Sequence, residues 1–82
     1  MNPAGSPRIH PLAEGRPIFA RDGVRLGTVS ELRPPFMKVR GGNGRHYWLP
    51  IGTVYSTSAL VVTMSFRSVR LADFALSTLA AA

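Results

Sequence analysis

Short apolar runs alternate with glycine and proline along most of this 82-residue chain. From Pro17 onward the runs are rich in Val, Ile, Phe and Thr, and turn residues interrupt them about every ten residues, as in small all-β barrels. We therefore expect an all-β fold, a small five-stranded barrel with a turn at residues 51–54 and a short C-terminal helix. The predicted strands are residues 18–20, 24–32, 36–40, 45–49 and 60–66.

The second predicted strand contains a break in its alternation, because Leu26 and Val29 are three residues apart rather than two. Strict alternation would send these two side chains to opposite faces of the sheet. One extra residue between them would return both to the core, and Gly27 lies at that point, where a glycine commonly marks a β-bulge or a sharp bend. Asp22 and Gly23, just before the strand, are typical of a tight hairpin turn. The spacing predicts that Gly27 curves the sheet.

The same stretch has a superficial likeness to a phosphate-binding loop, because Gly23 is followed four residues later by Gly27 and Thr28. The Gly-Lys-Ser/Thr ending of such a loop is missing, and no helical pattern follows to present its N-terminus to a phosphate. The sequence therefore favours a structural role for these glycines.

A glycine-rich loop, residues 41–44, joins the third and fourth predicted strands. In the fourth strand His46 and Trp48 point to one face of the sheet, and Tyr47 and Leu49 point to the other. If His46 and Trp48 face outward, they form an aromatic platform ringed by cations that suits nucleic acid. Alternatively, Trp48 packs beneath the C-terminal segment, as large aromatic side chains usually do. In either case the candidate partner-binding residues are Lys38, Arg40, Arg45, His46 and Trp48.

The last segment changes its period from strand to helix. Ser68 suits the N-cap position, and a helix of about twelve residues is marginal in water unless it docks on another surface. This helix is expected to cover the open end of the barrel or to pair with a second copy of the chain. The residues at helical spacing are Val69 or Ala72, Phe74 or Ala75, and Leu79.

Three regions follow from these patterns. Residues 1–16 hold three prolines and few large apolar groups, so we expect a flexible N-terminal arm. Residues 17–66 form the barrel domain, and residues 67–82 form the helical tail. The first residues lack the apolar stretch of a signal peptide, and no run approaches the roughly 20 apolar residues that span a bilayer. The expected location is the cytoplasm, with no membrane span.

Charge adds a candidate partner. Ten basic and four acidic residues leave a net charge of +6, and a sequence pI of about 11.5 is typical of proteins that bind polyanions such as nucleic acid. A compositional explanation competes, because nine of the ten basic residues are arginine, a bias that a GC-rich genome produces without selection for binding. The basic residues are also scattered, with no two adjacent.

Three stretches carry a resemblance to a known family: "PIFARDGVRLGTV", "YWLPIGTVYS" and "ALVVTMSF". Together they resemble the PRC-barrel superfamily, in particular a small bacterial branch that is a domain of unknown function. The resemblance covers residues 17–66 and implies a small SH3-like β-barrel that acts as a docking or assembly module without catalytic residues. Pro34-Pro35 and the C-terminal tail depart from the pattern, so the resemblance does not define a partner surface.

Catalytic chemistry finds little support in the sequence. The two histidines, His10 and His46, are isolated from each other, and the four carboxylates are spread over arm, turn, strand and tail. The chain has no cysteine and no paired histidine spacing for a metal. We predict a non-catalytic interaction or assembly module that binds a protein partner, without cofactor, metal or small-molecule substrate. The alternatives are a nucleic-acid-binding small barrel and self-association.

Overall fold

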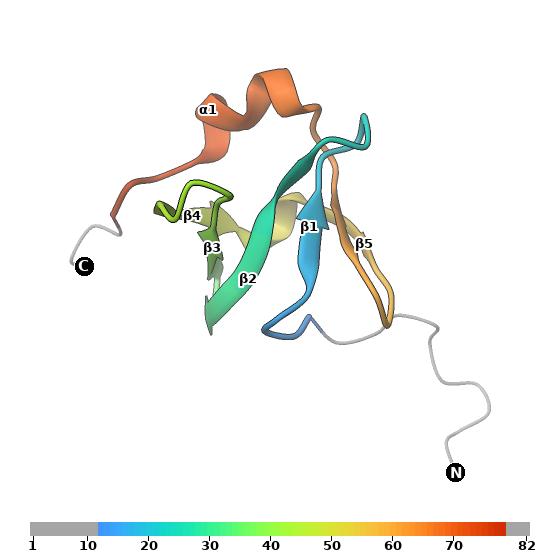
Figure 1. Cartoon of the computed structure of the whole chain (residues 1–82), viewed down its shortest axis with the longest axis horizontal. Helices are drawn as coiled ribbons and strands as arrows, with labels where there is room; N and C mark the ends of the chain where they lie inside the picture. The colour runs from blue at the N-terminus through green and yellow to red at the C-terminus, as the bar shows by residue number, and fades with distance from the viewer. Residues whose placement is uncertain (1–11, 79–82) are drawn as a thin grey trace, which may run out of the picture.

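The computed structural model describes residues 12–78, and within that range the chain forms six β-strands, two 3₁₀ turns and one short α-helix (Figure 1). The prediction of an all-β fold is confirmed, and the third predicted strand has the predicted bounds. The strands are β1 (Pro17–Phe19), β2 (Arg25–Arg33), β3 (Phe36–Arg40), β4 (His46–Pro50), β5 (Val54–Thr57) and β6 (Val62–Met64). The helical elements are η1 (Ile51–Thr53), η2 (Ser68–Arg70) and α1 (Leu71–Phe74).

All six strands belong to one sheet, in the order β4-β3-β2-β1-β6-β5. β2, β3 and β4 form an antiparallel meander, whereas β1 pairs antiparallel with β2 on one side and parallel with β6 on the other. β4 and β5 are the two edges, and they do not pair with each other. The predicted five-stranded barrel is therefore wrong, since the sheet has six strands and stays open.

The additional strand is β5, which begins at the last residue of the predicted turn and otherwise covers residues to which no element was assigned. Its sequence, Val-Tyr-Ser-Thr, carries no alternating apolar pattern. In the structure Val54 is only partly buried and Tyr55 is 60% exposed. β5 forms by pairing with β6, with Val54 opposite Met64 and Thr57 opposite Val62. Tertiary pairing, rather than local pattern, makes this strand.

One face of the sheet carries the hydrophobic core. Val62, Met64 and Phe66 join it as predicted, but Leu60 is 76% exposed. The reason is a turn before β6, in which the Ser58 hydroxyl accepts hydrogen bonds from the backbone N–H groups of Leu60 and Val61, at 3.1 Å and 3.0 Å. The buried core residues are Ile18, Val29, Met37, Val39, Leu49, Val62, Met64 and Phe66.

The bulge predicted at Gly27 is present. Ile18 on β1 lies opposite Gly27, while the next residue, Phe19, lies opposite Arg25, so Leu26 is the extra residue. As the spacing requires, Leu26 packs against the core and Val29 is buried within it. The glycine is needed for close approach, because a Cβ atom there would collide with the Arg40 carbonyl oxygen on β3.

The predicted N-terminal arm spans residues 1–16, of which residues 1–11 lie outside the described part of the chain. Its last residues contact the sheet. Leu12 packs against the core, and the Gly15 N–H donates to the Val29 carbonyl at 2.8 Å. The Arg16 guanidinium donates to the Ser58 carbonyl at 2.9 Å. Residues 12–16 therefore belong with the folded domain.

The C-terminal segment docks on the sheet, but the predicted helix of about twelve residues is wrong. Helical structure ends at Phe74, whose ring stacks on Phe66 with centroids 4.8 Å apart. Ala75 is extended, and Leu76 exchanges two backbone hydrogen bonds with Trp48 on β4, at 2.8 Å and 2.9 Å. An unpaired strand edge offers bonds to an extended segment, and these compete with helix continuation, which is marginal at this length.

Ser68 does not cap the helix as predicted, because it bonds to Asp22 in the β1–β2 turn. The Asp22 carboxylate accepts from the Ser68 hydroxyl at 2.8 Å and from its backbone N–H at 3.2 Å. The Ser68 hydroxyl is the main cause that lowers the pKa of Asp22 below its ordinary value. The carboxylate thus fastens the β1–β2 turn to η2.

This link predicts a pH effect. Because the folded pKa of Asp22 is depressed, its stabilising contribution is fully present well above the ordinary pKa of about 3.9 and is lost as the pH falls below that value and through the lower folded pKa. In Asp22→Asn the amide does not titrate, so the melting temperature of the native chain should exceed that of the variant at pH 7, and the difference should shrink as the pH falls below about 4. Thermal unfolding followed by circular dichroism at four pH values measures this, with Ser68→Ala as the matched variant. A difference independent of pH would contradict it.

Candidate functional site

Four of the five residues predicted to bind a partner lie on one face of the β3–β4 hairpin. Lys38 lies directly opposite Trp48, and Arg40 lies directly opposite His46, in the register of the two strands. Residues directly opposite each other in an antiparallel pair share a face. The fifth, Arg45, ends the connecting loop, where its backbone N–H donates to the Asn43 side chain at 3.0 Å.

Trp48 is buried, with 8% of its surface exposed. The Lys38 ammonium lies 5.7 Å and the Arg33 guanidinium 5.4 Å from the centre of its ring, within cation–π range. Leu76 also pairs with the Trp48 backbone. The indole is therefore covered rather than offered as a stacking platform, which is the arrangement expected when Trp48 packs against the chain itself.

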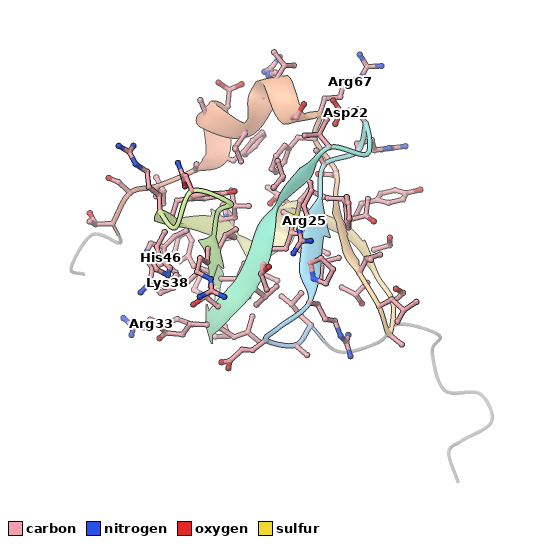
Figure 2. The ribbon with its side chains drawn as sticks, in the orientation of Figure 1. Asp22, Arg25, Arg33, Lys38, His46 and Arg67 are labelled. Atoms are coloured by element: carbon pink, nitrogen blue, oxygen red, sulfur yellow. The ribbon has the colours of Figure 1, made fainter. Side chains whose placement is uncertain are left out.

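A basic face runs across the outer side of β2, β3 and β4, opposite the core. Lys38 and Arg33 both lie over the Trp48 ring. Arg25 donates to Thr28, the residue opposite Arg40 on the neighbouring strand. Figure 2 shows Arg33, Lys38 and His46 gathered beside β3 and β4, and Arg25 nearer the middle of the sheet. We call this set the basic face; its members are Arg25, Arg33, Lys38, Arg40 and His46.

Intramolecular ion pairs neutralise little of this charge. Within residues 12–78 the ion pairs are Arg33 with Glu31, at 2.9 Å, and Arg70 with Asp73, of which only the first lies on the basic face. Both pairs are solvent-exposed, and exposed pairs contribute about 0 to 1 kcal/mol each. The basic face therefore keeps a net positive charge that is available to a partner.

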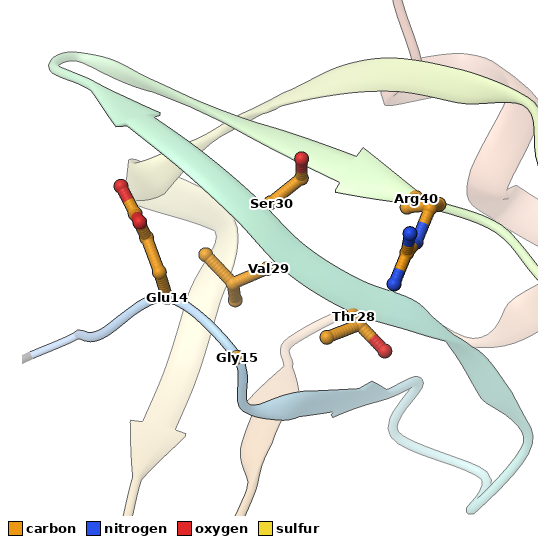
Figure 3. Close-up of a pocket in the computed structure, with 6 residues that line it drawn as sticks. All are labelled: Glu14, Gly15, Thr28, Val29, Ser30 and Arg40. Carbon is orange, nitrogen blue, oxygen red and sulfur yellow. The ribbon is translucent and has the colours of Figure 1, made fainter.

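Two shallow pockets adjoin the basic face and share Thr28 and Arg40. The first, of about 390 Å³, is shown in Figure 3, where the Arg40 side chain extends from β3 toward Thr28. The second, of about 330 Å³, lies beside the bulge. The first is lined by Glu14, Gly15, Thr28, Val29, Ser30 and Arg40. The second is lined by Arg25, Leu26, Gly27, Thr28, Arg40, Gly41 and Gly42.

Tyr47 points to the opposite face of the hairpin, where it contacts the bulge. Its hydroxyl donates to the Leu26 carbonyl at 3.2 Å, and burial raises the pKa of the phenol. Leu49, next along β4 on that face, is fully buried. At Trp48 and Leu49 the edge strand is therefore covered on both faces.

Among residues 12–78, no group of three or more His, Cys, Asp or Glu side chains is arranged to hold a metal ion. In the same part of the chain no helix is long and apolar enough to cross a membrane. Comparison with protein-family models, with curated proteins and with solved structures finds no match for the chain.

Two members of the basic face, Arg25 and Arg33, were missed by the sequence analysis. Arg33 flanks a Pro-Pro turn, and nothing local indicates that it lies over Trp48. For Arg25 a signal was present, because the bulge that returns Leu26 and Val29 to one face does the same for Arg25 and Thr28, which are also three residues apart.

Proposed function

We propose that this domain is a non-catalytic interaction module that binds an acidic protein partner through the basic face. The observation that supports the proposal is the surplus of positive charge on one sheet surface. Four Lys and Arg side chains and His46 lie there, whereas Glu31 is the carboxylate that pairs with one of them. Complementary charge accelerates association with an acidic partner and orients it.

The buried indole favours protein over nucleic acid as the partner. Domains that bind single strands without sequence preference combine a positive groove with aromatic side chains on which bases stack. Here Trp48 is 8% exposed beneath Arg33 and Lys38. Nucleic acid remains the alternative, supported by the net charge of +6.

Membership of the PRC-barrel superfamily remains a prediction from the sequence, as do a bacterial origin, a cytoplasmic location and self-association. The docking or assembly role that the resemblance implies agrees with the proposal. The resemblance concerns the class of function and not the identity of the partner.

Binding of a labelled poly-glutamate peptide, measured by fluorescence anisotropy over a salt series, tests the proposal. We expect Arg33→Gln/Lys38→Gln to weaken binding about tenfold, because each of two partly exposed charge contacts contributes about 0.7 kcal/mol. The matched control is Arg21→Gln/Arg67→Gln, which removes the same charge elsewhere. Arg67 lies at the other end of the sheet (Figure 2), and Arg21 lies over Tyr55 on the opposite edge strand.

Single-stranded and duplex oligonucleotides of matched length are titrated in parallel. Tighter binding of either oligonucleotide, with a log–log salt slope of about −3 or steeper, would replace the proposal with the nucleic-acid alternative. Equal losses in both double variants would reject the basic face as the binding surface.

A further inference from the structure

A pair of arginines converges on one threonine beside the bulge, without a carboxylate between them. Thr28 lies directly opposite Arg40 in the register of β2 and β3, and the Arg40 side chain extends toward it (Figure 3). From the other direction, the Arg25 guanidinium donates to the Thr28 hydroxyl oxygen at 3.0 Å. The bulge is what allows this, because it returns Arg25 and Thr28 to one side of the sheet.

We propose that Arg25, Thr28 and Arg40 form a binding site for a phosphate group. Arginine presents a planar fork of donors that matches phosphate oxygens and binds them with charge-assisted hydrogen bonds. The Thr28 hydroxyl accepts from Arg25, so its own proton is available to an anion. The site does not require the helix N-terminus or lysine of a phosphate-binding loop, since side chains from two strands supply the donors.

The charges around the site favour an anion. Within residues 12–78 neither Arg25 nor Arg40 takes part in an ion pair. Glu14 lines the adjoining pocket together with Arg40, yet no ion pair joins the two. Two guanidinium groups that line one pocket repel each other, and a bound dianion would offset that repulsion.

The shape of the site also suits a phosphate group. Arg25 and Arg40 line the same pocket of about 330 Å³, at the lower end of the range of small-ligand pockets. Gly41 and Gly42 form part of the wall. The pocket therefore brings two guanidinium groups and the Thr28 hydroxyl to one small cavity.

Titration of the full chain with inorganic phosphate, followed by ¹H–¹⁵N NMR at constant ionic strength with chloride, tests the site. Saturable shifts are expected for the amides of Thr28, Gly41 and Gly42. In Arg40→Gln the affinity should fall by at least about tenfold, the loss expected for one charged hydrogen bond. Thr28→Val, which keeps the shape of the side chain, should weaken binding less. Arg67→Gln, with the same change of charge at the other end of the sheet, should bind phosphate as the native chain does.

The source of the phosphate group is distinguished by two further probes, a phosphoserine peptide and a nucleoside monophosphate. Whichever binds more tightly than inorganic phosphate identifies the larger ligand, and equal affinities assign the site to the phosphate group alone. Shifts that grow linearly without saturation, or an equal loss in Arg67→Gln, would overturn the site. Arg25 and Arg40 also belong to the basic face, yet the two tests are distinguishable, because acidic-peptide binding is measured on Arg33→Gln/Lys38→Gln and phosphate binding on Arg40→Gln.

Discussion

Gly27→Ala should lower the free energy of unfolding by about 3 kcal/mol, the upper end of the usual cost of overpacking an interior. The new Cβ atom would collide with the Arg40 carbonyl oxygen and lie 2.8 Å from the Val39 Cγ1 atom. A side chain can rotate away, but the carbonyl belongs to the backbone of β3, which pairs on both sides. Relief therefore requires β2 and β3 to separate locally.

Urea unfolding followed by circular dichroism measures this cost, with Gly52→Ala as the control. Gly52 lies in η1, where a Cβ atom would meet nothing within 4 Å. For a domain of this size 3 kcal/mol corresponds to a fall of roughly 12 to 24 °C in melting temperature. Equal stability of the two variants would mean that β2 and β3 tolerate a wider spacing than the structure has.

The Gly27 bulge also shows what the sequence could predict. Leu26 and Val29 are both apolar, and the three-residue spacing between them is incompatible with a regular strand, so the irregularity was readable from two side chains and one glycine. β3 was also predictable, because apolar and polar residues alternate from Met37 to Arg40 and Pro34-Pro35 precedes the strand, and its bounds were predicted correctly.

Where the structure departs from prediction, long-range backbone pairing is the cause. β5 and Leu76 are both extended because a neighbouring strand supplies backbone hydrogen-bonding partners. These partners come from β6 for β5, and from Trp48 on β4 for Leu76. Neither segment has an apolar pattern of its own that marks a strand. Local propensity is easily overridden in this way, particularly for strands. The extra strand β5 forms one edge of the sheet, and it does not pair with β4 at the other edge.

The candidate site was predictable only in part. Alternation placed Lys38, Arg40, His46 and Trp48 on one face of a hairpin, as the register confirms. Burial of Trp48 depended on side chains that come from elsewhere in the sheet, and the sequence left its two alternatives open. Cation–π contacts from Arg33 and a bridge from Leu76 join residues 15 and 28 positions away, separations that no local pattern encodes.

A second large effect is expected at Ile18, in the strand that joins the two parts of the sheet. β1 has three residues, yet it pairs with β2 on one side and with β6 on the other. Ile18 is fully buried and lies opposite both Gly27 and Val62. Its side chain therefore packs where the antiparallel meander meets the β5–β6 hairpin.

Ile18→Ala should cost about 4 kcal/mol, within the range of about 2 to 5 kcal/mol for a buried isoleucine truncated to alanine, whereas Ile18→Val should cost about 1 kcal/mol. A domain of this size has only about 4 to 12 kcal/mol of stability in total, so the alanine variant should be partly unfolded at 37 °C. Urea unfolding gives the two free energies, and amide hydrogen exchange tests where the loss acts.

Because β1 provides the strand pairing between the two parts of the sheet, hydrogen exchange in Ile18→Ala should accelerate at Val62 and Thr63 more than at Met37 and Val39. The latter pair keep neighbours on both sides within the meander. Uniform acceleration would instead mean that the sheet unfolds as one unit, and a cost no greater than that of Ile18→Val would mean that the core relaxes into the space. Either result would show that β1 is not a weak junction in the open sheet.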